Sequence, residues 1–414
     1  MAYLSLTDTE QRTAFFRASA LRNLHYWQAR LTTNTDLLPP EEHNNLLRAV
    51  KMALPLDEAW PLLYDIVTGV SPLLERRGRW EAGHWAISHA LEAARRRHDS
   101  AAEVTLSALT ARLLFQQSRY PESVRAYRRV IRLARRIGDK FNEARACTNL
   151  GYHFAEQGYW YRAEVLCCYA LDLFEQIDSN HGRAHTENHL GILYTRQHRW
   201  QEAQQHLEQA CNIWQTMGDE HGLMRGYLNI GLLHVDAKQP DQALDYLEMA
   251  LRQTQLTREK ITIGRVYLNM GKAFRLLLDW SQAEVYTKEA ESIFEACSDL
   301  TELSRTWNGL GLIYFHQRRW GEANLYLEKS LNLWRRLGIK FEEIEVLLDI
   351  GECEMWQGYY VQAAERLREV EQQIGLTSEQ GPYRHLWPRL NQYRHDLDES
   401  LGEKRAASLG GCEV

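Results

Sequence analysis

The chain has 414 residues, of which 44% are hydrophobic and 25% charged, a balance typical of a folded globular protein rather than of a disordered one. This length exceeds that of one ordinary domain and predicts either two domains or an extended repeat array. The net charge of −6 argues against nucleic acid as a partner, although it is compatible with one basic groove on an acidic body.

The cysteine spacing indicates a reducing compartment, and the apolar segments give no sign of a signal peptide or a membrane helix. The seven cysteines include no CxxC pair and no metal-finger spacing. The opening residues, MAYLSLTDTEQR, lack the basic and then apolar order of a signal peptide. No apolar run approaches the roughly 18 residues that a membrane helix needs. We therefore expect a cytoplasmic protein with no membrane partner.

Residues 1–58 carry no repeat and are expected to form an N-terminal helical cap. A first helix is predicted to begin near Thr7, with Glu10 three residues later as in a capping box. The segment PPEEHNNLLRAVKMAL (39–54) predicts a second helix. Both helices would cover the apolar face of the first repeat.

Residues 59–378 repeat with a step of 40 residues. In each unit an aromatic residue or a proline follows a glycine by nine positions, and an alanine follows that glycine by twelve. Weaker copies around Trp80 and Tyr120 extend the array to about eight units. The repeated glycines are Gly151, Gly191, Gly231, Gly271, Gly311 and Gly351.

Each unit predicts two helices joined by a tight turn. Apolar residues fall at helical spacing on both sides of breaks such as QHRW (197–200), and segments such as MGDE (217–220) place a glycine at the end of the second helix. The glycine and alanine positions indicate where two helices cross closely, and the aromatic residue would cover the turn. The expected fold class is all-α, a right-handed superhelical solenoid. Residues 379–414 would add a C-terminal capping helix and a flexible tail, RAASLGGCEV.

These Leu-Gly, aromatic and alanine spacings resemble the tetratricopeptide repeat (TPR) motif in a 40-residue form. Within that superfamily the chain is similar to the spindle-orientation adaptors that bind GoLoco-domain partners. Residues 41–54 and the segment LLERRGRWEAGHW (73–85) are also similar to the TPR sensor arrays of bacterial signal-transducing (STAND) NTPases, although no NTPase motif is present. The resemblance implies a scaffold or adaptor in signalling.

Two sets of polar residues recur along the first helices of the 40-residue repeats, and we call each set a column. They lie six and two positions before the repeated glycine and therefore share one helical face. In the resembled families this face is concave, and the asparagine column resembles the ladder with which O-GlcNAc transferase grips an extended peptide. The candidate peptide-binding residues are Arg145, Asn149, His185, His189, Arg225, Asn229, Arg265, Asn269 and Arg305. The pattern ends where Gly309 replaces asparagine and where Glu345 and Asp349 reverse the charge.

These residue types suit an extended acidic segment of a partner protein. An asparagine amide both donates and accepts, so it can satisfy a peptide unit whatever that unit's side chain. Arginine binds carboxylates in a bidentate way. Protein–protein interaction through the concave groove is therefore the expected function. A structural role stays open, because the arginines could instead pair with acidic residues of the adjacent repeat.

Two other functions also stay open. The chain could be the sensor or regulatory subunit of a STAND-type signalling or defence system that acts in trans, or it could bind nucleic acid or a nucleotide in a basic groove. The arginine clusters at residues 94–97 and 125–136 are expected to be solvated charge on outer helices. The edges of a solenoid could also form a homo-oligomer.

Neither an enzyme nor a cofactor is expected, because the sequence contains no nucleotide-binding glycine motif and no nucleophile motif. His181, His185 and His189 are spaced four apart and could hold a metal ion on one helical face. No HExxH-type acid accompanies them. We therefore favour their interpretation as polar residues of the groove, with no metal site.

Overall fold

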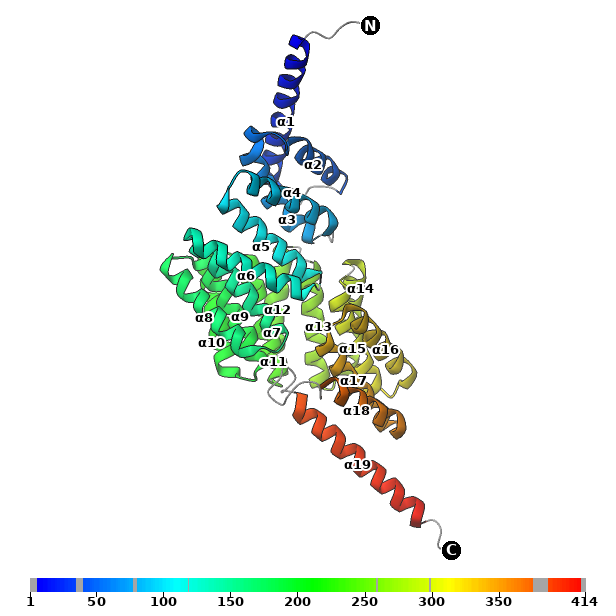
Figure 1. The fold of residues 1–414 in the computed structure, drawn as a ribbon. Coiled ribbons are helices and arrows are strands. Elements are labelled where there is room, and N and C mark those ends of the chain that lie inside the picture. The colour runs from blue at the N-terminus through cyan, green and yellow to red at the C-terminus, as the bar shows by residue number, and fades with distance from the viewer. Residues whose placement is uncertain are drawn as a thin grey trace, which may run out of the picture. The chain divides into compact units, whose positions relative to one another are not determined.

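The chain folds into helices throughout the residues that the structure describes. These are residues 6–34, 40–76, 80–117, 119–257, 260–297, 299–374 and 386–410 of a computed structural model. Successive helices pack in pairs, which confirms the prediction of an all-α repeat solenoid (Figure 1). Within these ranges no helix combines the length and the apolarity that crossing a membrane requires.

The chain divides into two compact units, Met1–Leu150 and Gly151–Val414, and their boundary falls inside helix α7 (Lys140–Glu156). The helices of unit 1 that precede α7 are α1 (Leu6–Asn34), α2 (Pro40–Ala53), the short 3-10 helix η2 (Asp57–Ala59), α3 (Trp60–Arg76), α4 (Trp80–Arg96), α5 (Ser100–Gln116) and α6 (Tyr120–Ile137). Both α1 and α2 pack against α3. Leu24, Leu46 and Leu63 are buried in the shared core.

Unit 2 continues the alternation of first and second helices. Its elements are α8 (Trp160–Gln176), α9 (Asn180–Arg196), α10 (Trp200–Met217), α11 (Glu220–Asp236), α12 (Pro240–Thr257), α13 (Lys260–Leu276), α14 (Trp280–Cys297), α15 (Leu300–His316), α16 (Trp320–Leu337), α17 (Lys340–Trp356), α18 (Tyr360–Ile374) and α19 (Trp387–Gly410). The first helices α9, α11, α13, α15 and α17 each contact the next one in the series, and α19 packs on α17 and α18. The first helices therefore form a continuous layer.

Five of the six repeated glycines lie where the two helices of a hairpin cross, as the sequence predicts, whereas Gly351 faces Tyr393 of α19. A Cβ atom on Gly191 would lie 2.4 Å from Cγ of Leu207 and 3.2 Å from the carbonyl oxygen of Ala203. A Cβ on Gly231 would lie 2.7 Å from Leu247. Since Ala203 and Leu207 are fully buried, a larger side chain at position 191 would push the two helices apart.

A column of helix caps was not anticipated from the sequence. Asp99, Ser179, Asp219 and Asp299 each accept a hydrogen bond from the backbone N–H three residues later. Such a side chain satisfies one of the amides that a helix start leaves unpaired. The 40-residue step therefore preserves the starts of the first helices as well as their crossings.

The turn inside each hairpin requires a left-handed backbone. Gly158 and Gly358 adopt φ of +77° and +80°, whereas the equivalent Leu278 adopts φ of +60°. A side chain in this conformation is strained, while glycine is not. Leu278 is 67% exposed, so its side chain adds little to the core.

We expect Leu278→Gly to raise the free energy of unfolding by about 1 kcal/mol, because it removes this backbone strain. Urea unfolding monitored by circular dichroism measures the change. Gly358→Leu, the matched change in the opposite direction, should lower stability by a similar amount. A loss of stability in Leu278→Gly would contradict the expectation and would indicate that the leucine side chain packs usefully.

Candidate functional site

The predicted peptide-binding residues fall in two places. Arg145 and Asn149 belong to the part of α7 in unit 1, where the Arg145 guanidinium lies 5.7 Å from the centre of the Phe141 ring. Burial and the charge of Arg112 lower the pKa of Arg145. The other seven residues lie on α9, α11, α13 and α15 of unit 2. We call the side of these first helices that carries them the inner face of unit 2.

Two of the inner-face arginines link successive repeats. The Nε of Arg265 donates to Oε1 of Glu302 at 2.8 Å, and Nη2 of Arg305 donates to Oε1 of Glu342 at 2.6 Å. Burial acts to raise the pKa of Glu302, but Arg265, Arg305 and Lys272 outweigh it and lower that pKa. The carboxylate is therefore ionised and held between repeats. Both arginines thus pair with an acidic residue of the adjacent repeat, which was the structural alternative to peptide binding. Peptide binding by these two arginines stays a prediction.

Arg225 occupies the same column in a different setting. The position that Glu302 and Glu342 occupy in the later repeats is Thr262 in this one, so no carboxylate is available there. Arg225 is exposed, its Nε donates to the carbonyl oxygen of His221, and its guanidinium lies 5.7 Å from the centre of the Trp214 ring. The carboxylate that pairs with Arg265 and Arg305 in the later repeats thus has no counterpart at position 262.

The histidines of the column are neutral groups. Burial and the charge of Arg225 lower the pKa of His185 to about 2 and that of His189 to about 4. The ring of His189 lies tilted against that of Tyr152, with 4.8 Å between the ring centres, and its buried Nδ1 has no hydrogen-bond partner among the described residues. A neutral imidazole offers one donor and one acceptor, and a ligand can reach this nitrogen only if the side chains that cover it move.

The asparagine column is used partly within the fold. Nδ2 of Asn229 donates to Oδ1 of Asn188 in the preceding repeat at 2.8 Å. Asp349, which ends the column, accepts at 2.8 Å from Nδ2 of Asn308, a residue next to the column in the preceding repeat. Asn269 is only 7% exposed and so presents little surface to a partner. Asn229 is half-buried. Its carbonyl oxygen is therefore better placed than that of Asn269 to meet a peptide N–H.

Lys272 and Arg275 are two inner-face cations that the sequence reasoning missed. Lys272 lies two helical turns after Arg265 on the same face of α13, and Arg275 lies one turn beyond. Burial lowers the pKa of both side chains; Asp236 acts against this at Lys272, and Asp349 does so at Arg275. Neither side chain forms an ion pair or a hydrogen bond with another described residue. Both cations could have been predicted from the sequence by following the polar face of the helix for two more turns.

The acidic end of the columns is covered by α19. Arg389 donates from Nη1 to Glu345 at 2.9 Å, from Nη2 to Asp349 at 2.5 Å and from Nε to Glu352 at 2.9 Å. Burial raises the pKa of Glu345 to about 7, against the lowering effect of Arg389. The charge reversal noted in the sequence thus has a partner within the chain. The predicted loose tail, residues 405–414, is helical as far as Gly410, and residues 411–414 lie outside the described part.

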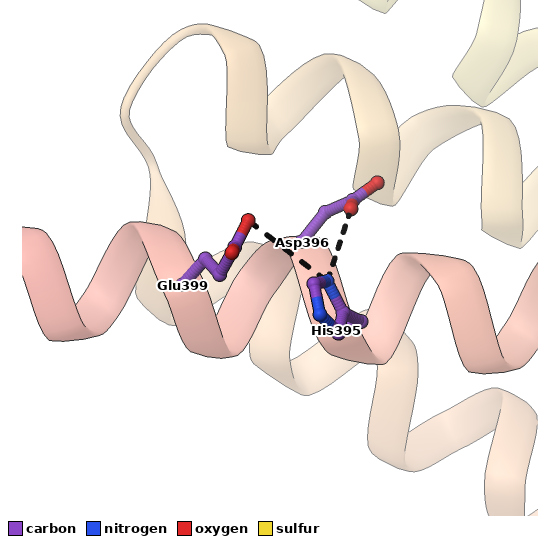
Figure 2. Close-up of side chains that lie close together, drawn as sticks. All are labelled: His395, Asp396 and Glu399. Atoms are coloured by element: carbon purple, nitrogen blue, oxygen red, sulfur yellow. Dashed lines mark ion pairs between the residues drawn. The ribbon is translucent and has the colours of Figure 1, made fainter.

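One group in the described ranges has the spacing of metal ligands, and it lies away from the predicted histidines. His395, Asp396 and Glu399 project from α19, with Nδ1 of His395 at 3.6 Å from Asp396 and 3.9 Å from Glu399 (Figure 2). All three come from one helix, and the His395 side chain is 66% exposed. No second element contributes a ligand, so we assign no metal to this group.

Comparison with known proteins places the repeats in a family. A family model described as tetratricopeptide repeat matches residues 142–216, and a second with the same description matches residues 305–337. A search of curated protein sequences found no match. The narrower resemblance to GoLoco-binding adaptors stays a prediction.

Three solved structures share the fold. The Rap conjugation gene regulator of plasmid pLS20, in complex with the Phr* peptide, is 15% identical over 83% of this chain and 99% of that one, with a TM-score of 0.59. NprR in complex with its cognate peptide NprX is 12% identical over 75% and 88%, with a TM-score of 0.54. A STAND protein with a tetratricopeptide repeat sensor from Pyrococcus horikoshii is 12% identical over 87% and 56%, with a TM-score of 0.51. At these identities the similarity is one of fold.

Proposed function

Because the chain belongs to the tetratricopeptide repeat superfamily, we propose that unit 2 is a protein–protein interaction module whose inner face binds an extended acidic segment of a partner protein. Repeat solenoids present continuous inner surfaces of this kind to extended ligands. The proposal is one of binding in the cytoplasm, without catalysis and without a cofactor.

The observation that carries the proposal is the pair of cations on α13. Lys272 and Arg275 are half-buried, and neither is paired directly with a carboxylate in the described part of the chain. A partly buried charge without a partner is unfavourable, because it loses hydration and gains no ion pair in return. An acidic side chain of a bound segment would supply the missing partner.

The neighbouring groups suit the backbone of the same segment. Asn229 can exchange hydrogen bonds with a peptide unit, and Arg225 adds an exposed guanidinium. Arg265 and Arg305, held by Glu302 and Glu342, would shape the wall beneath the peptide. The peptide complexes of the Rap regulator and of NprR support this mode of binding for a related fold. The acidic character of the ligand rests on the cations of this chain alone.

The proposal predicts that Lys272→Gln/Arg275→Gln loses its partner while remaining folded. Affinity purification from a lysate, followed by mass spectrometry, identifies the partner of the wild-type chain. A synthetic peptide of its acidic segment is then titrated against each variant by fluorescence anisotropy. We expect about a tenfold weaker affinity, because two charge-assisted contacts are lost. Arg252→Gln/Arg368→Gln, which neutralises two exposed arginines on second helices, should bind as the wild type does.

Stability separates this role from a structural one. Since the two cations have no direct partner among the described residues, Lys272→Gln/Arg275→Gln should melt at or above the wild-type temperature. A lower melting temperature would show that the charges support the fold, and unchanged affinity would show that the segment binds elsewhere. A peptide with its acids replaced by amides should lose the same affinity as the double variant. If it does not, the ligand is not recognised through its acids.

A regulatory role in trans is the second candidate, favoured by the fold shared with the STAND protein. That protein extends well beyond the matched part, because this chain spans 56% of its length. Co-purification of an NTPase with the wild-type chain, and a change in its ATP hydrolysis on adding the chain, would support this role. If no NTPase co-purifies with the wild-type chain, the regulatory role in trans is rejected.

A further inference from the structure

The two units differ in charge. Unit 1, residues 1–150, carries 22 lysines and arginines against 16 acidic residues, whereas residues 151–414 carry 27 against 39. Unit 1 therefore has a net charge of +6 and unit 2 one of −12. The negative net charge of the whole chain argues against nucleic acid as a partner, but it does not apply to unit 1, which is basic.

The positive charge of unit 1 is concentrated on one face of α6. Ser123, Tyr127, Val130 and Ala134 form the buried face of this helix. Six arginines occupy the opposite face, and all of them are exposed. They are Arg125, Arg128, Arg129, Arg132, Arg135 and Arg136. At a rise of about 1.5 Å per residue they span about 16 Å along the helix.

Acidic residues of the fold neutralise only part of this face. Arg129 donates to Glu103 at 3.0 Å and Arg135 donates to Glu143 at 2.8 Å. Arg128, Arg132 and Arg136 form no ion pair or hydrogen bond with any residue that the structure describes. These three are four residues apart and form a straight row. The row is thus open to an external anion.

The fold does not require arginine at these positions. The equivalents of Arg128 in later repeats are Cys168, Glu208, Glu248, Lys288, Glu328 and Arg368, and those of Arg132 are Asp172, Asn212, Arg252, Ser292, Asn332 and Gln372. Outward positions of second helices therefore accept acidic, neutral or basic residues. Six arginines together on one face of α6 repel one another, and the packing of the fold gives no reason for this concentration.

We propose that the arginine face of α6 binds the phosphate backbone of a nucleic acid without reading its sequence. Six arginines over about 16 Å, two of them in ion pairs with Glu103 and Glu143, form a linear array of positive charge that can lie along a DNA duplex, which carries one phosphate per about 1.7 Å. Every cation on the face is arginine, whose guanidinium binds phosphate oxygens in a bidentate way.

The two competing anionic partners fit the face less well. A protein partner would normally bury an apolar or aromatic centre, and the row of Arg128, Arg132 and Arg136 contains none. A membrane surface would favour an apolar side available for insertion, but the apolar side of α6 is packed into the core of unit 1.

The test uses the full chain and a short fluorescein-labelled DNA duplex of arbitrary sequence, with anisotropy as the signal. We expect binding at about 50 mM salt, with a slope of log K against log salt of about −3 to −5, because three to six phosphates are neutralised. Arg128→Glu/Arg132→Glu should weaken binding by about tenfold or more. The matched control is Arg252→Glu/Arg368→Glu, the same charge change at the same repeat positions on α12 and α18 of unit 2, and it should not weaken binding.

Three results would overturn the proposal. The first is no binding of the duplex by the wild-type chain at about 50 mM salt. The second is equal loss of binding in the α6 variant and in the control, which would reflect net charge alone. The third is co-sedimentation with phosphatidylserine vesicles without binding of the duplex, which would assign the face to a membrane. Circular dichroism and melting of both variants establish that they are folded. If the glutamate variant unfolds, Arg128→Gln/Arg132→Gln is measured instead, and the same outcomes apply.

Discussion

Arg389→Ala is expected to lower the free energy of unfolding of unit 2 by about 2 kcal/mol, measured by urea unfolding. The guanidinium joins α19 to three carboxylates of α17, those of Glu345, Asp349 and Glu352. The side chain of Asp349 is only 9% exposed, so removing the arginine would leave a buried charge without its partner. The expected loss in the free energy of unfolding is smaller than for a fully buried ion pair, because the Arg389 side chain is 32% exposed.

A second arginine of α19 provides the control. Arg394 pairs with Glu371, and the two side chains are 44% and 36% exposed. Arg394→Ala should therefore change stability by less than about 0.5 kcal/mol, as is usual for surface pairs. Equal effects of the two substitutions would show that α19 is held by its apolar contacts, with Leu390, Tyr393 and Leu397 in the core.

The effect of Arg389→Ala should also depend on pH. Burial raises the pKa of Glu345 in the folded chain to about 7, from an ordinary value of 4.5. Glu345 therefore favours folding when it is protonated, and this contribution is lost as pH rises through the folded pKa. Removing Arg389 takes away the group that opposes the raised pKa. The difference between variant and wild type should thus be larger at pH 8 than at pH 5, and the reverse order would contradict this account.

The fold could be predicted because its constraints are local and recur at a fixed step. Gly231, for example, is required by its close approach to Ala243 and Leu247, which lie twelve and sixteen residues later in the same hairpin. Each repeat solves the same packing problem with the same residue types, so the period can be seen without a structure. The cap residues, such as Asp219, recur with the same 40-residue step. They were not recognised from the sequence because the residue at this position varies between aspartate and serine.

The inner face was less predictable because its chemistry depends on pairs between repeats. The polar columns are visible in the sequence, but the partner of Arg265 is Glu302, 37 residues later, and that spacing is set by how one hairpin stacks on the next. Arg389 meets Asp349 across 40 residues and from a helix that has no repeat signature. Sequence alone shows which residues are polar. Whether an arginine is already in an ion pair, as Arg305 is, or has none with the described residues, as is true of Arg275, follows only from the packed structure.

Gly311→Ala and Gly309→Ala, two positions apart on α15, are expected to change stability in opposite directions. A Cβ on Gly311 would lie 2.6 Å from Cγ of Leu327 and 3.2 Å from its backbone nitrogen, whereas one on Gly309 would meet Thr287 at 3.6 Å and Leu268 at 3.9 Å. Gly311→Ala should therefore lose about 2 kcal/mol through overpacking at the crossing, and Gly309→Ala should gain up to about 1 kcal/mol through its higher helix propensity.

Urea unfolding of the two variants of α15 separates the two roles that glycine has in this array. Because the substitutions are chemically identical and lie on the same helix, propensity and unfolded-state effects cancel between them, and the difference reports the crossing alone. Equal gains in stability would show that α15 and α16 can move apart at no cost, and glycine at the repeated position would then need another explanation. A loss at position 309 would indicate that this gap in the asparagine column is itself required by packing against α13 and α14.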